Sequence, residues 1–299
     1  MTAKDTDWAF DQYQNVRATL PSARFAGPTT LVSSLADLAD QFDVFLLDAF
    51  GVLNVGETAI PSAPERVADL QAAGKRVMVM TNGATVPAEA ALEKYHCLGF
   101  RFDLKDVISS RDVLVAALAA YPVANWGVMA AAHSQIDRLP VSARLLGTDR
   151  RTYDAVDGFL FLSTAEWSAD RQEILRVSLA ENPRPVLVGN PDIVAPRESG
   201  LSMEPGYYAH NLARQTGTTP VFFGKPFGDI YNLAFQQFSN QSKERILMVG
   251  DTLHTDILGG AAAGIRTALV TGHGLFAGRE IRPYIESSGI RPDFILPSP

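Results

Sequence analysis

The sequence has very little cysteine, no long hydrophobic run and no signal-like beginning. Its single cysteine, Cys97, cannot form a disulfide or a thiolate metal cluster within the chain, and we expect it to be buried and unreactive. No run of about 18 apolar residues occurs, so no membrane-spanning helix is predicted. The first residues, MTAKDTDWAF, lack the basic start and apolar core of a signal peptide, and a cytoplasmic location is therefore expected.

Positive charge is also scarce. The 299 residues include 26 Lys and Arg against 33 Asp and Glu, which gives a formal net charge of -7. Such an acidic balance argues against broad binding to nucleic acid phosphates or to an anionic membrane. A phosphate bound here would need local cations, backbone N–H groups or a metal ion.

Several catalytic motifs are missing. The chain has no GxxxxGK[ST] phosphate loop, no GxSxG nucleophile turn and no HExxH zinc motif. Their absence disfavours P-loop kinases and ATPases, serine hydrolases and zinc proteases. The histidines show no paired spacing typical of metal ligands; they are His96, His133, His210, His254 and His273.

What is present is an alternation of apolar strands and helices. Residues 44–47 and 76–80 predict buried strands, and a helix is predicted from Ser62, with Glu65 at capping-box spacing. Further strands are predicted in PVFFGK, ending at Lys225, and in RILMVGD, ending at Asp251. Continuous apolar strands alternating with helices indicate a parallel sheet covered on both faces.

The hydrophobic content of 46% and the length favour two units. We expect an N-terminal arm over 1–30, a core domain over 31–109 and 220–299, and an inserted domain over 110–219. The insertion has its own predicted strands in WGVMA, DGFLFL and PVLVG. The predicted fold class is α/β, with a Rossmann-like parallel sheet in the core and an inserted α/β cap.

Polar residues stand at the ends of four predicted strands: Asp48, Thr81 with Asn82, Lys225, and Asp251. Ligands of open parallel sheets bind beyond the carboxyl ends of the strands, so these side chains are expected at one edge. Each alone is ordinary, because Asp and Asn often cap helices or form turns and Lys is usually solvated. The four together indicate a site.

The four segments LLDAFGVL, MTNG, GKP and GDTLHTD resemble the four motifs of the haloacid dehalogenase superfamily, whose members use an aspartate nucleophile. The long insertion between the second and third motifs resembles the type-2 cap of subclass IIA, the sugar-phosphate and p-nitrophenyl-phosphate phosphatases. The stretches GNPDIVAP and EPGYYAHNLARQTG support that branch. The resemblance covers nearly the whole chain.

This resemblance implies a role for each matched residue. Asp48 would attack phosphorus and form an aspartyl-phosphate, with Lys225 neutralising the repulsion between carboxylate and phosphate. Thr81, Asn82 and Gly83 would bind phosphate oxygens. Mg²⁺ would be the cofactor, and its expected protein ligands or orienting groups are Asp48, the carbonyl of Phe50, Asp251 and Asp256. Asp256 could equally be the N-cap of a helix that begins at Ile257.

Phe50 departs from the phosphatase pattern, in which a second Asp two residues beyond the nucleophile protonates the leaving oxygen. Such acid–base help is typically worth about 10²- to 10⁴-fold. The chain could therefore be a slow phosphatase, or a catalytically retired member that binds a phosphorylated ligand. A dehalogenase is disfavoured, because halide displacement gains nothing from Mg²⁺. The cap of the dehalogenases also usually lies between the first two motifs, and the roughly thirty residues between Asp48 and Thr81 are too few for it. His254 either replaces the missing acid or faces solvent.

The cap is expected to set the substrate. Asn190 and Asp192 match a recurrent cap motif of the branch and could bind substrate, although Asn-Pro-Asp also forms a turn by itself. Ser163 ends a cap strand where many relatives carry Asp, so their substrates do not transfer directly. The expected partner is a small phosphorylated metabolite, and a homodimer is possible.

Overall fold

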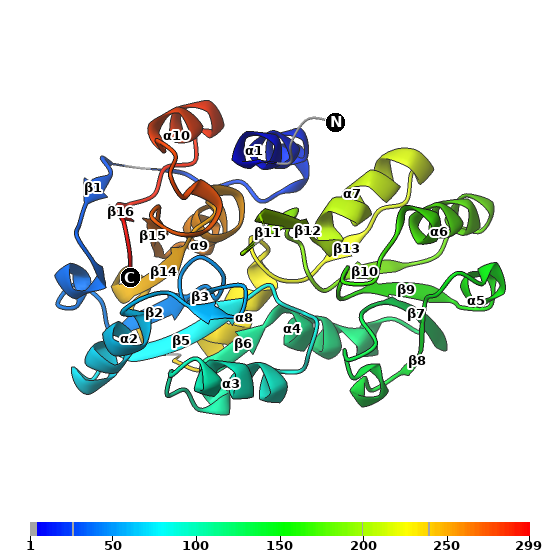
Figure 1. Cartoon of the computed structure of the whole chain (residues 1–299), viewed down its shortest axis with the longest axis horizontal. Coiled ribbons are helices and arrows are strands. Elements are labelled where there is room, and N and C mark those ends of the chain that lie inside the picture. The colour runs from blue at the N-terminus through cyan, green and yellow to red at the C-terminus, as the bar shows by residue number, and fades with distance from the viewer. Residues whose placement is uncertain (1–4, 26, 199, 239) are drawn as a thin grey trace.

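The computed structural model describes residues 5–25, 27–198, 200–238 and 240–299. Positions 1–4 of the expected N-terminal arm therefore lie outside the described residues. Two parallel sheets, each with helices packed on it, lie side by side (Figure 1). The predicted α/β class, with a Rossmann-like core and a second α/β unit inserted, is confirmed.

The core sheet has seven strands, all parallel. Its central strands are buried on both faces, which is why they read as continuous apolar runs in the sequence. In spatial order the strands are β1 (Thr30–Leu31), β16 (Phe294–Leu296), β15 (Arg266–Val270), β14 (Ile246–Gly250), β2 (Val44–Leu47), β5 (Arg76–Thr81) and β6 (Val107–Ser109).

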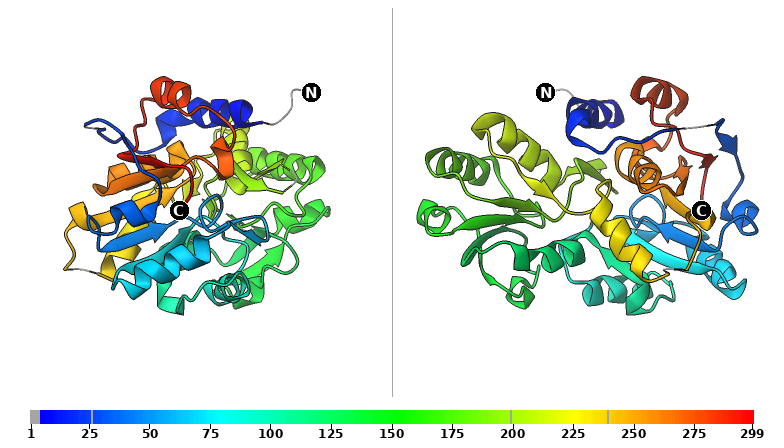
Figure 2. Two further views of the ribbon diagram at one scale, coloured as in Figure 1. Left: turned by 60° about the vertical axis from the view of Figure 1, so that its left-hand side comes forward. Right: turned by 180° about the vertical axis from the view of Figure 1, so that it is seen from behind.

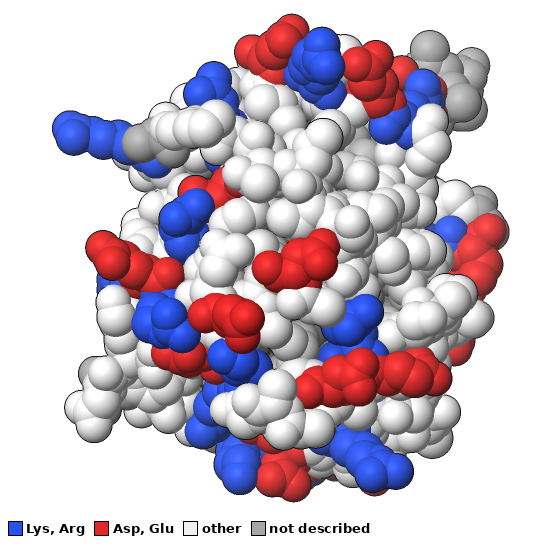
Figure 3. Space-filling view, turned by 90° about the vertical axis from the view of Figure 1, so that its left-hand side faces the viewer, with Lys and Arg blue, Asp and Glu red and all other residues white. Residues whose placement is uncertain are grey.

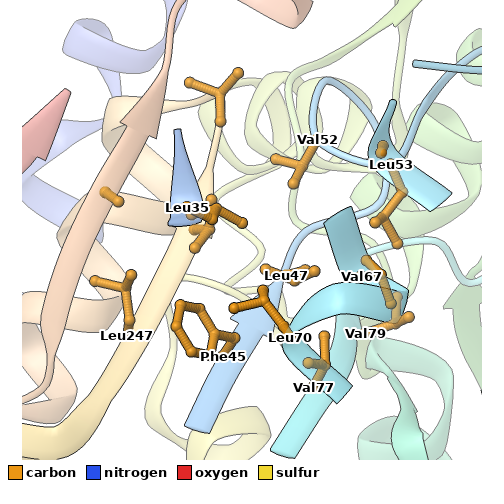
Figure 4. Close-up of a cluster of buried hydrophobic side chains, with 14 of the residues drawn as sticks. Leu35, Phe45, Leu47, Val52, Leu53, Val67, Leu70, Val77, Val79 and Leu247 are labelled. Atoms are coloured by element: carbon orange, nitrogen blue, oxygen red, sulfur yellow. The ribbon is translucent and has the colours of Figure 1, made fainter. Parts of the chain in front are cut away.

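One face of the core sheet packs against α2 (Ala63–Ala72) and α3 (Ala88–Cys97). Figure 4 shows Phe45 and Leu47 of β2 on this face, close to Val67 and Leu70 of α2. Burying each such side chain contributes roughly 1.5–3 kcal/mol. This packing holds β2 in the middle of the sheet and so fixes the position of the residue that follows it.

The opposite face of the core sheet packs against α4 (Ser110–Ala117) and α8 (Gly228–Gln236). The alternate residues of β2, Val44 and Leu46, point to this side. The same hydrophobic cluster includes Trp126 and Leu160 from the second sheet. The two sheets therefore share a continuous apolar cluster rather than meeting through polar surfaces.

The second sheet is also parallel, with its order given by β13 (Val221–Phe222), β10 (Val186–Val188), β9 (Gly158–Phe161), β7 (Asn125–Met129) and β8 (Ser142–Leu145). A separate cluster on this sheet contains side chains of α5 (Arg150–Asp154), α6 (Ala169–Glu181) and α7 (Pro205–Thr216). Two antiparallel hairpins accompany the sheets: β3 (Asn54–Val55) with β4 (Thr58–Ala59), and β11 (Val194–Arg197) with β12 (Gly200–Met203).

The strand before Lys225 corrects one expectation. We placed PVFFGK in the core sheet, but β13 pairs in parallel with β10 of the second sheet. Lys225 therefore follows the last strand of the inserted unit, and Gly224 before it has φ of 117°, in a region that favours glycine. The chain brings Lys225 back to the core site as it leaves the second sheet.

The N-terminal arm contains α1 (Thr6–Asn15), which lies beside α10 (Arg282–Ser288) in all three ribbon views (Figures 1 and 2). Their contact includes the Phe10 and Tyr284 rings, which meet edge to face with centroids 5.1 Å apart, and a hydrogen bond from the Tyr284 hydroxyl to Asp7. The same cluster includes α9 (Leu258–Ala263) and Ile193 of the inserted unit. The arm thus touches both units.

Some local expectations were wrong. The helix α2 begins where predicted, but Ser62 adopts φ of 64° and makes no side-chain capping bond. Cys97 is exposed at the end of α3 rather than buried.

Within the described part of the chain, no helix is long and apolar enough to cross a membrane. One face of the core shows positive and negative side chains interspersed (Figure 3).

Candidate active site

Asp48 is the first residue after β2, at the carboxyl edge of the core sheet. Its backbone N–H donates to the carbonyl of Val249 on β14 at 2.8 Å, which extends the sheet pairing by one residue. The chain then turns through Gly51, whose φ is 81°. A Cβ at Gly51 would lie 2.6 Å from the side chain of Asp251, so glycine is needed both for the turn and for the close approach of the two loops.

Lys225 lies between two carboxylates. Its Nζ donates to Asp48 Oδ1 at 2.6 Å and to Asp256 Oδ1 at 2.7 Å, and its side chain is 2% exposed. Short, charge-assisted bonds of this kind are stronger than neutral ones. The predicted proximity of Asp48 and Lys225 is therefore present in the structure, although Lys225 arrives from a different sheet.

Burial dominates the electrostatics of this cluster. Desolvation raises the pKa of Asp48 to about 7, against the lowering effect of Lys225. Desolvation also raises the pKa of Asp251 well above its usual range, and the charges of Asp256 and Asp48 add to that shift. Burial alone would lower the pKa of Lys225, but Asp256 and Asp48 outweigh it and the pKa is raised. Lys225 therefore stays positively charged, but its single charge does not offset the desolvation of Asp48 and Asp251.

Three of these acids could hold a metal ion. Asp48, Asp251 and Asp256 each offer a carboxylate oxygen within 4.8 Å of the others. Oxygen-only ligands suit Mg²⁺, and a divalent cation would offset the desolvation and the repulsion between carboxylates that raise the pKa values of Asp48 and Asp251. The donor set therefore fits the expected cofactor.

The loop that carries Asp251 and Asp256 has an unusual local structure. Residues Leu253–Ile257 form a π-helical turn that continues into α9, so Asp256 lies inside the turn and not at the N-cap of a helix from Ile257. Its Oδ2 accepts the N–H of Thr252 at 3.1 Å. Gly250 lies directly behind it, because a Cβ there would be 2.0 Å from the Asp256 carboxyl carbon.

The last residue of β5 and the segment that follows make more contacts within the protein than expected. Thr81 Oγ1 accepts the N–H of Gly83 at 3.0 Å. The side chain of Asn82 is fully engaged: its Oδ1 accepts the N–H of Lys225 at 2.7 Å, and its Nδ2 donates to the Lys225 carbonyl and to Asp192 Oδ1, both at 2.8 Å. Asn82 therefore joins the core edge to Lys225 and to the inserted unit.

A cavity of about 740 Å³ opens above this edge, large enough for a small metabolite. Its walls include eight residues of the predicted site, Asp48, Phe50, Thr81, Asn82, Gly83, Asn190, Asp192 and Asp251, together with Lys94, Arg197, Glu204 and Ser163. Lys225 and Asp256 lie beneath it, buried.

The ring of Phe50 lies between two cations. Lys94 Nζ is 5.1 Å from the ring centroid and Arg197 Cζ is 4.7 Å from it, a cation–π arrangement. Both cations also have acidic partners: Lys94 pairs with Glu57 at 2.8 Å and Arg197 with Glu204 at 3.1 Å. The ring therefore links α3 of the core to the β11–β12 hairpin, and it carries no ionisable group.

The GNPD segment lies at the cavity but is held by protein contacts. Asn190 Nδ2 donates to Glu204 Oε2 at 3.2 Å, and Asn190 Oδ1 accepts the N–H of Asp192 at 2.9 Å. The hydrogen bond between Asp192 N–H and Asn190 Oδ1 is typical of a turn, which the sequence analysis gave as the alternative to substrate binding. Ser163 also lines the cavity and is buried.

His254 is neither a solvent-facing residue nor part of the cavity wall. Its Nε2 hydrogen-bonds Gln14 Oε1 at 2.8 Å, and its ring stacks on Tyr13 with centroids 5.2 Å apart. Burial lowers the pKa of His254 to about 3, so the imidazole is neutral near pH 7. It is therefore a poor replacement for the missing acid.

Sequence reasoning missed Lys94 and Arg197 on the two sides of Phe50, and Tyr13 of the N-terminal helix. The hydroxyl of Tyr13 accepts the N–H of Ile193 at 3.1 Å, directly after Asp192. None of the three stands in a local motif, and each acts across a long sequence separation. They can be assigned to the site only from the three-dimensional structure.

These features define a family, and comparison with known proteins agrees. A family model described as haloacid dehalogenase-like hydrolase matches residues 45–137, and a second model, HAD-hydrolase-like, matches residues 222–298. The glycerol-3-phosphate phosphatase of Gallus gallus is 32% identical over 282 residues, covering 86% of this chain and 89% of the relative. The chain belongs to the haloacid dehalogenase-like hydrolases, as its motifs predict.

Other similar proteins are also named phosphatases. The chloroplastic phosphoglycolate phosphatase 1A of Arabidopsis thaliana is 26% identical, covering 81% of this chain and 72% of the relative. Among solved structures, a possible sugar phosphatase of Cytophaga hutchinsonii has a TM-score of 0.79 at 26% identity, covering 91% of this chain and 98% of that one. The p-nitrophenyl phosphatase of Archaeoglobus fulgidus shares the fold, with a TM-score of 0.71 at 21% identity and coverage of 86% and 97%. The subclass IIA assignment is confirmed.

Proposed function

We propose that this protein is a Mg²⁺-dependent phosphatase that hydrolyses a small phosphate monoester through an aspartyl-phosphate on Asp48. The observation that carries the proposal is the position of Lys225, 2.6 Å from Asp48 and 2.7 Å from Asp256, beneath a cavity of metabolite size. The phosphatase relatives, whose names include glycerol-3-phosphate and phosphoglycolate as substrates, support a small phosphorylated substrate.

The chain's own residues supply most of the reaction. Asp48 attacks phosphorus, the bond to the leaving oxygen breaks, and the phosphoryl group is held on the carboxylate. Lys225 neutralises charge next to the nucleophile, and Thr81 with the backbone N–H of Asn82 binds phosphate oxygens, the N–H of Gly83 being donated to Thr81 Oγ1. Water then attacks phosphorus, and inorganic phosphate leaves while Asp48 is regenerated.

A divalent cation would be held by Asp48, Asp251 and Asp256, with the carbonyl of Phe50 as a further ligand. When bound, it would neutralise phosphate charge and stabilise the transition state. A glycerol phosphate phosphatase of Mycobacterium tuberculosis, 24% identical to this chain, was solved in complex with calcium. Asn190 and Asp192 stand where the inserted domain meets the core site, and we assign them to the substrate side.

Turnover of two substrates tests the proposal. The protein with Mg²⁺ should hydrolyse p-nitrophenyl phosphate faster than an alkyl phosphate, because nitrophenolate leaves without a proton. Asp48→Asn should abolish both reactions. Binding of a phosphorylated ligand without turnover in any variant would instead identify a non-catalytic binding protein.

A further inference from the structure

Phe50 leaves the proposed phosphatase without the group that normally supplies a proton. The neighbouring cations do not fill the gap, because Lys94 is bound to Glu57 and to the Gly56 carbonyl, and Arg197 is bound to Ser202 and Glu204. Another side chain on the cavity must serve if alkyl phosphates are to be hydrolysed at a useful rate.

The carboxyls on the cavity wall narrow the choice. Asp48 and Asp251 belong to the nucleophile and metal cluster. Glu204 accepts hydrogen bonds on both oxygens, from Ser202 and Arg197 on one and from Asn190 on the other, so both of its oxygens are already engaged. Glu57 is exposed and paired with Lys94. Asp192 remains.

Asp192 is fixed at the reaction edge by contacts from three directions. Its Oδ1 accepts from Asn82 Nδ2 at 2.8 Å, and Asn82 also binds both backbone groups of Lys225. Its N–H donates to Asn190 Oδ1 at 2.9 Å. The next N–H along the chain, that of Ile193, donates to the Tyr13 hydroxyl at 3.1 Å. Among the described residues, Asp192 Oδ2 has no hydrogen-bond partner, although the residue lines the cavity.

From this arrangement we propose that Asp192 protonates the leaving oxygen of the substrate and then activates water, in the role that position 50 does not fill. The inference rests on the proposed phosphatase function and names the missing catalytic residue.

The surroundings of Asp192 suit an acid. Burial raises its pKa well above the usual range, the charges of Asp48 and Asp256 raise it further, and Lys225 and the Asn82 hydrogen bond oppose that shift. The carboxyl therefore keeps its proton at a pH where an exposed Asp would be ionised. An acid with a pKa closer to the operating pH is better poised both to give and to take a proton.

The proton balance closes over the two steps. As Asp48 attacks phosphorus and the P–O bond to the leaving group breaks, the proton on Asp192 Oδ2 passes to the leaving oxygen, which departs as an alcohol. The resulting Asp192 carboxylate then removes a proton from the attacking water as its oxygen bonds phosphorus and the bond to Asp48 breaks. Inorganic phosphate leaves, and Asp192 is protonated again.

Asp192→Asn tests the assignment through its dependence on the leaving group. With an alkyl phosphate, kcat should fall by about 10²- to 10⁴-fold. With p-nitrophenyl phosphate, the first step needs no proton, so a stoichiometric burst of nitrophenol should survive, followed by slow turnover as the aspartyl-phosphate waits for water. Glu57→Gln, a carboxyl-to-amide change at the rim of the same cavity, should leave the ratio of the two rates unaltered.

A double variant separates a chemical role from a structural one. In Phe50→Asp/Asp192→Asn, the carboxyl at position 50 should restore alkyl phosphate turnover, which it would not do if Asp192 merely held the fold together. Wild-type rates in Asp192→Asn, or no recovery in the double variant, would overturn the assignment. If either of these outcomes occurs while Asp48→Asn is inactive in the same assays, only the role of Asp192 is refuted. If Asp48→Asn keeps full turnover, the proposed phosphatase function itself is wrong.

Discussion

Two lysines reach this site, and their surroundings differ. Lys225 is buried between Asp48 and Asp256, with 2% of its side chain exposed, whereas Lys94 pairs with the exposed Glu57 and keeps 28% of its side chain exposed. Because a charge interaction strengthens as water is excluded, the first lysine can hold a reacting phosphoryl group and the second can only adjust the rim. The core edge therefore carries the proposed chemistry, and the wall around Phe50 shapes access to it.

The largest expected effect comes from removing the buried lysine. Lys225→Met leaves two carboxylates without their cation, and breaking a buried pair in this way typically costs about 3–5 kcal/mol of stability. Activity should be lost as well. Lys94→Met, the matched change at the rim, should cost no more than about 1 kcal/mol. Urea denaturation measures both, and equal losses would contradict the comparison.

Two buried histidines extend the comparison to pH. His254 lies in the turn after β14, covered by α1, and His210 packs on Phe222 of the inserted unit; burial lowers the pKa of His254 to about 3 and that of His210 to about 4, from 6.5. Below pH 6.5 the unfolded chain takes up protons that the folded chain refuses. The histidine contribution to stability is therefore full above pH 6.5 and falls towards pH 4, by about 1.4 kcal/mol per pH unit for each histidine, whereas the raised pKa values of the buried carboxyls Asp48, Asp192 and Asp251 change stability in the opposite sense.

Denaturation of wild type, His210→Gln and His254→Gln at pH 7, 6 and 5 checks this expectation. Relative to wild type, each substitution should raise the stability at pH 5 compared with that at pH 7, by about 1.4 kcal/mol per pH unit below 6.5. A slope that neither substitution changes would show that these histidines are not the cause.

A smaller effect is expected from crowding the carboxylate of Asp256, which lies against Gly250. Gly250→Ala places a methyl group 2.0 Å from the Asp256 carboxyl carbon, whereas Gly147→Ala in the inserted unit meets nothing within 4 Å. Overpacking of this kind typically costs about 1–3 kcal/mol, and displacing Asp256 should also weaken Mg²⁺ affinity. Calorimetric titration with Mg²⁺ tests it; unchanged affinity in Gly250→Ala would argue against a role for Asp256 at the metal.

The smallest effect concerns the aromatic wall. Phe50→Leu keeps apolar bulk and the backbone carbonyl but removes the ring under Lys94 and Arg197, each contact being worth about 0.5–1 kcal/mol. Thermal unfolding should record a slight loss of stability, with Mg²⁺ binding intact. Loss of Mg²⁺ binding would mean that the side chain at position 50 matters to the metal in a way that its carbonyl does not.

The sequence predicts the core edge well because its signals are local. Asp48 and Asp251 each follow a continuous apolar strand, and such strands must lie within a covered parallel sheet. The strand before Lys225 was placed in the wrong sheet, because a short apolar run does not say which sheet it joins. Its side chain still reaches Asp48, since the loop after β13 returns to the core.

Other parts of the site depend on contacts between distant segments. Two examples are the contact of Tyr13 with Ile193 and that of Phe50 with Arg197. Both join residues far apart in the sequence, so neither produces a local sequence pattern. His254 shows the same limit: its place in the metal loop suggested a proton donor, but α1 covers it and keeps it neutral. Motifs therefore indicate the proposed nucleophile and metal-binding groups, while packing decides which acid on the cavity wall keeps an oxygen without a hydrogen-bond partner among the described residues.

The most direct test of the account is to trap the phosphoryl group on Asp48. Wild-type protein is mixed with Mg²⁺ and p-nitrophenyl phosphate, quenched with acid and reduced with borohydride, which converts an aspartyl-phosphate to homoserine. Peptide mass spectrometry should find homoserine at position 48 and nowhere else. Phosphate release with Asp48 unmodified, or with another carboxylate reduced in its place, would contradict the account.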